Sequence, residues 1–380
     1  MKIVHVSHSF YPAIGGIENV VRSLAREQAK LGHDVSVITS KLGSSHHSKE
    51  QEEIDGVEIH RLDSRTFHLP DLTMPKRIPH DLLTQADVIH IHSQNSLFGI
   101  KILEEGHRSK VGTACHFMAV NAYGDHPNYI IRKMGPLYQR WAVNKCLRSS
   151  KLRFVRSLRD AEILRRDFDC NNTHYVPDGI DEEWITKSNN AKRFEEEYGL
   201  SGIDFVLFIG RLNYLKGIEY VIRSIPNVLE EWPSTKFVFI GPGKQRPYLD
   251  LSRALGVQES VRFTGFLDEN MKLAAVDAAS MLVVPSIADI AEVFSMTITE
   301  AWARGKAVIG TCVGELPFRI ESRRTGLLVP PRKSEALADA IISLLRDKSL
   351  SRKIGENARP YVQSWKQIAK DLVSIYDGSH

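Results

Sequence analysis

The sequence predicts an α/β protein with two doubly wound parallel-sheet domains. Short β-rich runs alternate with helical runs along the chain, which is typical of parallel sheets with helices on both faces. This alternation stops after Pro177-Asp178-Gly179 and starts again with a new apolar run. The 380 residues are also too many for one ordinary core. We expect one domain over residues 1–180, a second over 181–361, and a cleft between them at the carboxyl ends of the strands.

The first domain begins with a clear repeat of strand, helix and strand. The Gly32-His33 break separates its first helical run from the next apolar one. The same alternation predicts the elements that follow. The expected strands cover 2–7, 34–39, 87–92, 110–115 and 152–157, and the expected helices cover 16–31, 129–147 and the residues after 157. Residues 42–53 are polar and residues 68–79 hold three prolines, so we expect two loops there, the second of which could cover a binding site.

The second domain repeats the plan after a charged stretch around residues 195–197. The expected strands cover 204–210, 236–241, 260–265, 281–285 and 306–310, and the expected helices cover 217–232, 246–255, 269–279, the segment with Glu292 and Glu300, and 364–376. Pro226 should kink the helix that contains it. The last helix has an apolar face, and the residues alone allow it to pack on either domain. This face consists of Trp365, Ile368, Leu372 and Ile375.

Composition narrows the class of protein. Hydrophobic residues make up 42% and charged residues 25% of the chain, as in soluble globular proteins. No run approaches the length of a membrane span, and the first residues read as a strand and not as a signal peptide. The cysteines have no paired spacing, which favours reduced thiols in a cytoplasmic protein and argues against a zinc site. They are Cys115, Cys146, Cys170 and Cys312. We expect no metal, no cofactor and no nucleic acid partner.

Residues 129–166 carry most of the positive surplus of the chain. Eleven basic side chains face only Asp160 and Glu162 there, and such an excess attracts anionic surfaces. The basic residues are Arg132, Lys133, Arg140, Lys145, Arg148, Lys151, Arg153, Arg156, Arg159, Arg165 and Arg166. Interleaved apolar residues make part of the segment an amphipathic basic helix, which can lie on an anionic bilayer. A core-facing apolar stripe with a solvated basic face has the same period and remains the alternative.

Two glutamates follow the expected strand over residues 281–285. Glu292 and Glu300 are separated by slightly more than two helical turns, so both carboxylates could address one ligand from a single strand-to-helix junction. Phe294 and Ser295 fall where helix N-terminal amides would be free to bind phosphate. Carboxylates accept hydrogen bonds from sugar hydroxyls, so the motif suits a nucleotide-sugar. The alternative is a surface acidic pair on an amphipathic helix.

Two further loops follow strands and could bind phosphate. Gly15-Gly16 opens a helix, where the absent side chains let backbone amides approach a ligand, although such a pair is often only a turn. Arg211 and Lys216 follow the first strand of the second domain and could neutralise a diphosphate. An ordinary exposed loop is the alternative. The glycine spacings of dinucleotide-binding and Walker A loops are missing from both segments.

Histidines follow two strands of the first domain. His116 comes after the run over 110–115, and its neutral imidazole could donate to a sugar hydroxyl. His90 and His92 alternate, so both lie on one face of a strand and could suggest a metal. No third ligand is evident nearby, and we interpret them as histidines of the core or of the cleft lining.

Together these features resemble the retaining glycosyltransferases of family four, which have the GT-B fold of two Rossmann-like domains. The resemblance covers essentially the whole chain. It rests on Gly15-Gly16, residues 87–92, His116, residues 177–181, Gly210-Arg211 with Lys216-Gly217, residues 241–243, 262–265, the two-glutamate motif, 325–329 and Ser364-Trp365. The order and spacing of these pieces carry the resemblance.

The resemblance implies roles for these residues. Arg211 and Lys216 would bind the donor diphosphate and stabilise its departure. Glu300 would hold the ribose and Glu292 the donor sugar, with the amides around Phe294, Ser295 and Met296 near the sugar and phosphate. Gly16, beside Gly15, would approach the phosphate from the other domain, and His116 would face the transferred sugar. In the family the last helix, here within 362–380, packs back on the N-terminal domain.

The reaction implied by the resemblance moves a sugar from a UDP- or GDP-linked donor to an acceptor hydroxyl, with retention and without a metal. We expect an unknown acceptor that could be lipid-linked, and a cytoplasmic protein that could contact the inner face of the membrane through 129–166. Two departures stand out: Phe117 follows the histidine where the family often has an acid, and Gly314-Glu315-Leu316-Pro317-Phe318 replaces a Gly-Gly and Pro-Glu pattern. A nucleotide-sugar epimerase, a non-catalytic nucleotide-sugar-binding subunit and a nicotinamide oxidoreductase are the alternatives.

Overall fold

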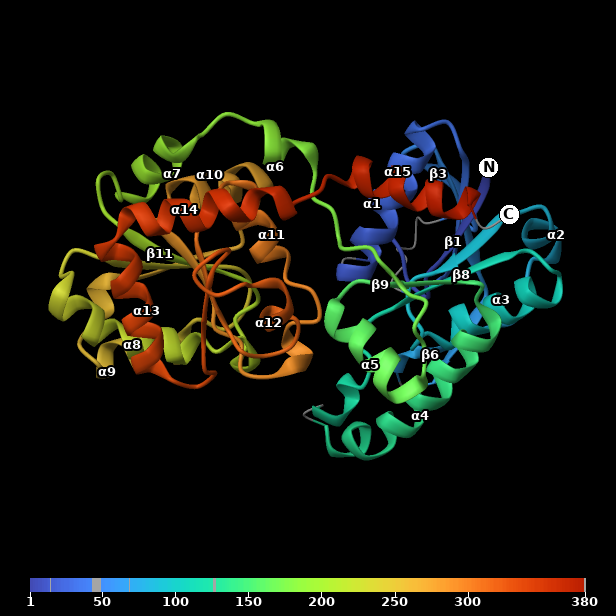
Figure 1. Ribbon diagram of the computed structural model, residues 1–380, viewed down its shortest axis with the longest axis horizontal. Helices are drawn as coiled ribbons and strands as arrows, with labels where there is room; N and C mark the ends of the chain where they lie inside the picture. The colour runs from blue at the N-terminus through green and yellow to red at the C-terminus, as the bar shows by residue number, and fades with distance from the viewer. Residues whose placement is uncertain (14, 43–48, 68, 126–127, 379–380) are drawn as a thin grey trace. The chain divides into compact units, whose positions relative to one another are not determined.

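The computed structural model describes residues 1–13, 15–42, 49–67, 69–125 and 128–378 (Figure 1). The chain divides into two compact units. Unit 1 comprises Met1–Gly179 and Ser364–His380, and unit 2 comprises Ile180–Gln363. The chain therefore leaves unit 1 once and returns to it for its last helix. The cleft expected between two domains stays a prediction.

Unit 1 is built on an eight-stranded sheet with the order β10-β9-β8-β7-β1-β2-β4-β3. Every neighbouring pair in it is parallel except β3 and β4. The strands are β1 (Lys2–Val6), β2 (Asp34–Ser40), β3 (Gln51–Ile54), β4 (Val57–Leu62), β7 (Val88–Ile91), β8 (Gly112–Phe117), β9 (Leu152–Val155) and β10 (His174–Tyr175). The central strands β1, β2, β7 and β8 are buried except at the first residue of β1, β2 and β8, as expected for a parallel sheet that helices cover on both sides.

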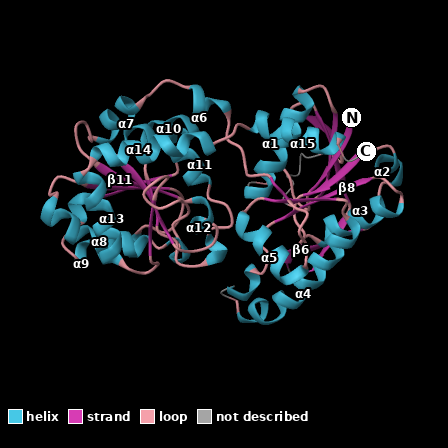
Figure 2. Cartoon of the chain, in the orientation of Figure 1, coloured by secondary structure: helices cyan, strands magenta, loops and turns pink. Residues whose placement is uncertain are grey.

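Helices cover both faces of this sheet (Figure 2). They are α1 (Gly16–Lys30), α2 (His80–Thr84), α3 (Leu97–Arg108), the short η1 (Ala122–Asp125), α4 (Tyr129–Ser149), α5 (Leu158–Phe168) and α15 (Trp365–Asp377). One core cluster joins the sheet to α3 and α4, and another joins it to α1 and α15. Side-chain caps fix several helix starts, for example Ser96, which accepts from the Gly99 amide, and Ser157, which accepts from the Asp160 amide.

The C-terminal helix belongs to unit 1. Leu372 and Tyr376 of α15 are fully buried in the cluster that also contains Val21 and Leu24 of α1. Gly179 permits the close approach of the returning chain, because a Cβ there would lie 2.7 Å from the Trp365 nitrogen. The residues alone left the docking of this helix open, and the structure places it on the first unit.

Unit 2 has a six-stranded, wholly parallel sheet with the order β13-β12-β11-β14-β15-β16. The strands are β11 (Phe205–Ile209), β12 (Lys236–Ile240), β13 (Val261–Gly265), β14 (Met281–Val284), β15 (Val308–Thr311) and β16 (Leu327–Val329). The order reverses between β11 and β14, which is the point where doubly wound sheets bind ligands.

The helices of unit 2 also cover both faces of the sheet (Figure 2). They are α6 (Glu182–Thr186), α7 (Ala191–Tyr198), η2 (Tyr214–Lys216), α8 (Ile218–Glu231), α9 (Arg246–Ala254), η3 (Gln258–Ser260), α10 (Glu269–Ala278), η4 (Asp289–Ala291), α11 (Met296–Ala303), α12 (Leu316–Arg319), α13 (Ser334–Arg346), α14 (Lys348–Ala358) and η5 (Arg359–Tyr361). The expected fold class of two doubly wound parallel-sheet units is therefore confirmed.

Both expected loops of the first domain contain strands. The polar segment 42–53 ends in β3, which pairs antiparallel with β4; its residues 43–48 lie outside the described chain. The proline-containing segment 68–79 includes β6 (Leu69–Pro75), which forms a two-stranded ribbon with β5 (Ser64–Phe67). Prolines are tolerated there because a strand of an isolated ribbon has one side that needs no ladder donor. In the described part of the chain, no helix is long and apolar enough to cross a membrane.

Candidate active site

The residues that the sequence singled out in unit 2 gather at the reversal point of its sheet. Arg211 and Lys216 follow β11, while Glu292 and Glu300 follow β14. These two strands are neighbours in the sheet, so their carboxyl ends open at the same edge. A sequence separation of 76 residues between Lys216 and Glu292 thus becomes a direct contact.

Gly217 brings these two loops together. It has φ +66° between η2 and α8, and a Cβ at this position would lie 2.0 Å from the carbonyl oxygen of Pro285. Only glycine fits such an approach without a shift of the backbone. Just before it, the Asn213 side chain accepts from the Lys216 amide at 3.2 Å and shapes the turn. The backbone therefore aims Lys216 at the loop after β14.

The Lys216 ammonium forms an ion pair with Glu292. Its Nζ lies 2.6 Å from Glu292 Oε1 and 2.8 Å from the carbonyl oxygen of Ala291. The Ser286 hydroxyl donates to the same carboxylate oxygen at 2.6 Å. The Glu292 side chain is only 2% exposed, while that of Lys216 is 26% exposed. The cation is thus held in place from the buried side and still reaches solvent.

Arg211 is the second cation at this edge of the sheet, and unlike Lys216 it is not held by a carboxylate in the described part of the chain. Its side chain is exposed, and it makes no ion pair or side-chain hydrogen bond with any residue in the described chain. One cation is therefore held by a buried carboxylate, and the other is available to a ligand. A free guanidinium beside a fixed ammonium suits a diphosphate, which offers several oxygens to both.

The two glutamates do not share a helix, contrary to the expectation from their spacing. Only Glu300 lies on α11, which begins at Met296 after Ser295; Glu292 ends the preceding η4 turn. Its carboxylate holds this loop through Ser286 and Lys216, which keeps the segment out of the helix. The two-turn argument therefore does not apply, although both glutamates remain at the same strand-to-helix junction.

Glu300 is buried and pairs with a lysine that the sequence did not single out. Lys272 of α10 lies 2.9 Å from Glu300 Oε1, and its ammonium sits 5.3 Å from the centre of the Trp184 ring. Burial raises the pKa of the Glu300 carboxyl, and Lys272 offsets part of that shift. Burial acts to lower the pKa of Lys272, but Glu300 and Glu269 together raise it above its ordinary value. Lys272 thereby opposes the effect of burial on the Glu300 carboxyl.

Arg319 of α12 holds the start of α11. Its guanidinium lies 4.3 Å from the centre of the Phe294 ring and donates to the Ser295 carbonyl and the Thr299 hydroxyl, both at 2.9 Å. The amides of Met296 and the next residues have no intrahelical partner, as at any helix start. Sequence reasoning missed Arg319 and Lys272, because only the tertiary fold brings them to the motif, and it gave no role to Ser286, which lies within the motif.

The remaining predicted residues lie in unit 1. Gly15 caps α1, and Gly16 begins it with open space where a Cβ would point. His116 lies inside β8 and not after it, because the strand continues to Phe117. Its side chain is 2% exposed and stacks on His90 with a centroid distance of 5.5 Å. Burial, with help from Arg156, lowers the pKa of His116 to about 3, so this imidazole is neutral near pH 7.

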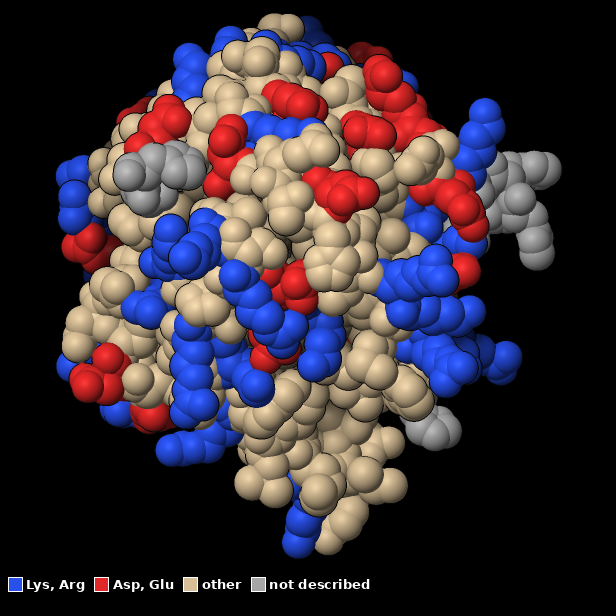
Figure 3. Space-filling view, turned by 90° about the vertical axis from the view of Figure 1, so that its right-hand side faces the viewer, with Lys and Arg blue, Asp and Glu red and all other residues tan. Residues whose placement is uncertain are grey.

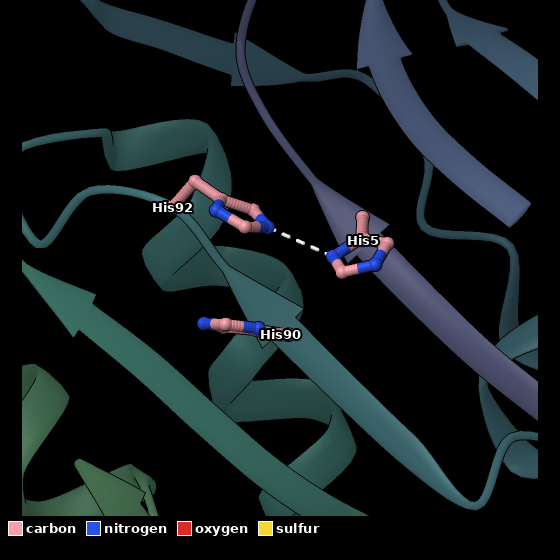
Figure 4. A group of neighbouring side chains, drawn as sticks. All are labelled: His5, His90 and His92. Carbon is pink, nitrogen blue, oxygen red and sulfur yellow. Dashed lines mark hydrogen bonds between the residues drawn. The ribbon is translucent and has the colours of Figure 1, made fainter. Parts of the chain in front are cut away.

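The structure supplies the third imidazole that was not evident beside His90 and His92. His5 of β1 joins them, and one ligand nitrogen from each lies within 4.8 Å of the others (Figure 4). However, His5 Nδ1 and His92 Nε2 are 2.8 Å apart and hydrogen-bonded. Ligands of a tetrahedral zinc stand about 3.3 Å apart, given Zn–N bonds near 2.0 Å. The nearby Arg156 cation also opposes a metal charge. His5 and His92 therefore fit a buried hydrogen-bonded chain that continues to Gln28, with His90 bonded separately to Tyr376, better than a metal centre.

Comparison with known proteins agrees with this geometry. The family model described as "Glycosyl transferases group 1" matches residues 190–361, and the model described as "Glycosyltransferase Family 4" matches residues 14–184. An uncharacterised glycosyltransferase of Methanocaldococcus jannaschii is 28% identical, with 99% of this chain and 98% of the relative covered. Glycogen synthase of Mycobacterium tuberculosis is 25% identical, with 99% and 94% covered.

Solved structures show the same fold. Sucrose-phosphate synthase from Thermosynechococcus elongatus has a TM-score of 0.76 at 22% identity, over 99% of this chain and 98% of that one. Anabaena HepE in complex with UDP has a TM-score of 0.75 at 19% identity, over the whole of both chains. These neighbours are GT-B proteins. Since the two family models together account for both halves of the sequence, the chain belongs to the group 1, family 4 glycosyltransferases.

Proposed function

We propose that the protein moves a sugar from a UDP- or GDP-linked donor to an acceptor hydroxyl, with retention of anomeric configuration. One observation carries the proposal: the buried Glu292 fixes Lys216 at the reversal point of the sheet, close in sequence to the exposed and available Arg211. Fixed cations stabilise negative charge that develops on a leaving diphosphate, and they need no rearrangement during the reaction.

The donor would occupy the edge of unit 2. Arg211 and Lys216 bind the diphosphate, and the amides at Phe294, Ser295 and Met296 lie near the sugar and phosphate. Glu292 accepts from donor-sugar hydroxyls while it keeps Lys216 in place. Glu300 accepts from the ribose hydroxyls, and Lys272 holds its carboxyl group in place. Anabaena HepE, which shares the fold, has been crystallised with UDP-glucose, and this supports a nucleotide-sugar donor.

The proposed reaction balances without an added reagent. The bond between the anomeric carbon and the diphosphate oxygen breaks, the acceptor oxygen bonds to the same face of that carbon, and the leaving phosphate takes the acceptor proton. Protein cations take the place of a metal. Gly16 approaches the phosphate, and the neutral His116 faces the transferred sugar. We place the reaction in the cytoplasm, where the four free thiols of the chain would stay reduced.

A panel of UDP- and GDP-sugars tests this function. Released nucleotide is measured with candidate hydroxyl acceptors, and the anomeric configuration of the product is read by NMR. We expect acceptor-dependent release from one or a few donors, with retention. Arg211→Gln should lower kcat by about 10²–10³-fold, because a preorganised charge is lost. The matched control is Arg246→Gln on α9, whose side chain is 92% exposed and should not matter.

Other results would overturn the proposal in distinguishable ways. Interconversion of donor sugars without acceptor-dependent nucleotide release would indicate an epimerase. Tight donor binding without any turnover would indicate a non-catalytic subunit. An inverted product would contradict retention, and an Arg211→Gln enzyme as active as the control would contradict the role of the guanidinium.

A further inference from the structure

The outer face of α4 carries a row of large apolar side chains that are open to solvent. Ile130 is 69% exposed, Met134 60%, Leu137 65% and Trp141 41%. They follow one another at spacings of four, three and four residues, which places them along one side of a helix. A stripe of this kind is unusual on a free surface, and it calls for an occupant.

A different set of side chains joins α4 to the core. The buried residues of the helix are Gly135, Gln139, Ala142, Val143, Cys146 and Ser149. They lie on the side opposite to the exposed row, and Ala142, Val143 and Cys146 belong to the core cluster of unit 1. The sequence left open whether the apolar residues of this segment face the core or a bilayer. The structure shows that the four residues of the stripe do not pack in the core.

Basic side chains flank the stripe, and the helix has no acidic residue at all. Lys133 and Arg140 lie on one side, and Arg148 continues the row by two turns beyond Trp141. Lys145 lies on the other side and is paired with Glu104 of α3. Figure 3 shows Lys and Arg side chains gathered above a lower end of unit 1 that is mostly uncharged. Apolar side chains between cations are the composition of helices that lie in the interface of an anionic membrane.

The structure also narrows the basic segment that the sequence indicated. Arg156 is buried and bonded to Asp178. Arg165 and Arg166 are exposed but pair with Glu162 and Asp167. The positive charge of α5 is therefore largely neutralised within that helix, whereas Lys133 and Arg148 of α4 have no acidic partner in the described chain.

We propose that the outer face of α4 docks unit 1 on an anionic lipid bilayer, with Ile130, Met134, Leu137 and Trp141 inserted among the lipid chains and the flanking cations on the headgroups. The charge of the helix selects this occupant, because an anionic bilayer satisfies the apolar row and the cations together. The inference does not depend on the transfer reaction, so failure of one leaves the other standing. A second copy of this chain and a protein partner are outcomes of the test.

Vesicle binding tests the proposal with the full-length protein. Phosphatidylcholine vesicles with and without phosphatidylglycerol are mixed with the protein and recovered by flotation at low and at high salt. We expect recovery with the anionic vesicles only, and a loss of recovery at high salt. Equal recovery with both vesicle types, or with neither, would overturn the proposal.

Two pairs of variants localise the contact. Lys133→Glu with Arg140→Glu should weaken vesicle affinity by about 30-fold or more, since each cation near an anionic surface contributes about fivefold. The matched control is Lys192→Glu with Arg193→Glu on α7, two exposed cations of unit 2, which should bind as the parent does. Ile130→Ser with Leu137→Ser should also release the protein, while Ile130→Val with Leu137→Ile should not. Circular dichroism checks that each variant is folded.

Trp141 reports insertion directly. Brominated lipid should quench part of the tryptophan fluorescence of the bound protein, and Trp141→Phe should remove that quenching while vesicle binding persists. Stripe variants that bind vesicles as the parent does, or a control pair that loses binding equally, would overturn the assignment to α4. Variants that change the mass in solution, but not vesicle recovery, would show that a second copy covers the stripe.

Discussion

Unit 1 and unit 2 share a doubly wound plan, but they bury different kinds of polar group. None of the 15 histidines of the chain lies in residues 180–363, so all are outside unit 2. Four of the histidines of unit 1 are at most 2% exposed: His5, His90, His92 and His116. Burial lowers the pKa of each, so that all four imidazoles are neutral near pH 7.

Unit 1 also buries an ion pair, Arg156 with Asp178, but unit 2 has no histidine and relies on such pairs. Lys216 with Glu292 and Lys272 with Glu300 lie at its candidate site. A third pair, Arg304 with Asp277, has both side chains less than a tenth exposed and joins α11 to α10. Lysine, arginine and carboxylate pairs keep their charges over a wide pH range, whereas an imidazole changes its charge near pH 6. The two units should therefore respond differently to acid, although their backbones follow one design.

Acidification should lower the stability of unit 1 and leave that of unit 2 nearly unchanged. We expect this effect to be the largest of those predicted for the two units. A histidine whose pKa is lower in the folded than in the unfolded chain contributes stability above about pH 6.5, and this stability is lost as the pH falls toward the folded value. The folded values are about 4 for His5 and about 3 for His116. At pH 5 protonation of these two residues lowers the free energy of unfolding of unit 1 by about 4 kcal/mol. His90 and His92 lower it further.

One carboxyl of unit 1 acts in the opposite direction. Burial raises the pKa of Asp160 to about 6, so the charged carboxylate destabilises the fold. Its protonation at pH 5 removes this penalty and offsets about 1 kcal/mol of the stability lost through the histidines. Hydrogen exchange read by mass spectrometry at pH 7.5 and pH 5 would follow peptides of each unit separately, after correction for the intrinsic exchange rate. Equal loss of protection in both units would contradict the comparison.

The polar interiors show how far the sequence could predict this molecule. Apolar runs and helical spacing predicted β1, β11 and most other elements to within a few residues, because those patterns are local. The contact of His5 with His90 was not predictable in the same way. It follows from the parallel register of β1 and β7, which places these residues opposite each other across 85 positions of sequence.

The candidate site likewise combines residues that local sequence predicted with contacts that only the fold creates. The sequence singled out Lys216, Glu292 and Glu300 from local motifs, but not the residues that hold them. Lys272 and Arg319 reach the motif from α10 and α12, and Ser286 lies six residues before Glu292 in the loop after β14. The spacing of the glutamates even suggested a shared helix, because a helical period cannot show that a lysine and a serine hold one of them outside it. Partner identity therefore required the strand order of the folded unit.

Breaking one charged pair of unit 2 should have the next largest effect. Lys216→Met leaves the buried Glu292 carboxylate without its cation and should destabilise unit 2 by about 2 kcal/mol, less than for a fully buried pair because Lys216 is partly exposed. Adding Glu292→Gln removes the stranded charge and should restore most of that stability, while both variants stay inactive. Thermal unfolding and nucleotide release measure the two effects.

The paired design separates a structural from a chemical role. If Lys216→Met is as stable as the parent, the ion pair contributes nothing to the fold of unit 2. If the double variant regains turnover, the ammonium is not needed for departure of the diphosphate. Hydrogen exchange in unit 1 should be unchanged in both variants, since no part of the pair lies there.

The smallest effect should come from one hydroxyl under the histidines of unit 1. Tyr376 of α15 is fully buried, and its hydroxyl lies 2.6 Å from His90 Nδ1. Tyr376→Phe keeps the ring, which meets His90 and Phe154 edge to face, and removes only the hydroxyl. A buried imidazole nitrogen that loses its partner should destabilise unit 1 by about 1–2 kcal/mol.

The control for this variant is Tyr361→Phe in unit 2, where the ring is 52% exposed and the hydroxyl can bond to water. Denaturant unfolding should show a lower midpoint for Tyr376→Phe only, and hydrogen exchange should increase in α15 and β7. An unchanged midpoint would mean that apolar contacts alone fasten α15 to α1. A loss of protection in unit 2 would mean that the last helix couples the stability of both units, and the contrast between a histidine-filled and an ion-paired interior would then not govern how each unit unfolds.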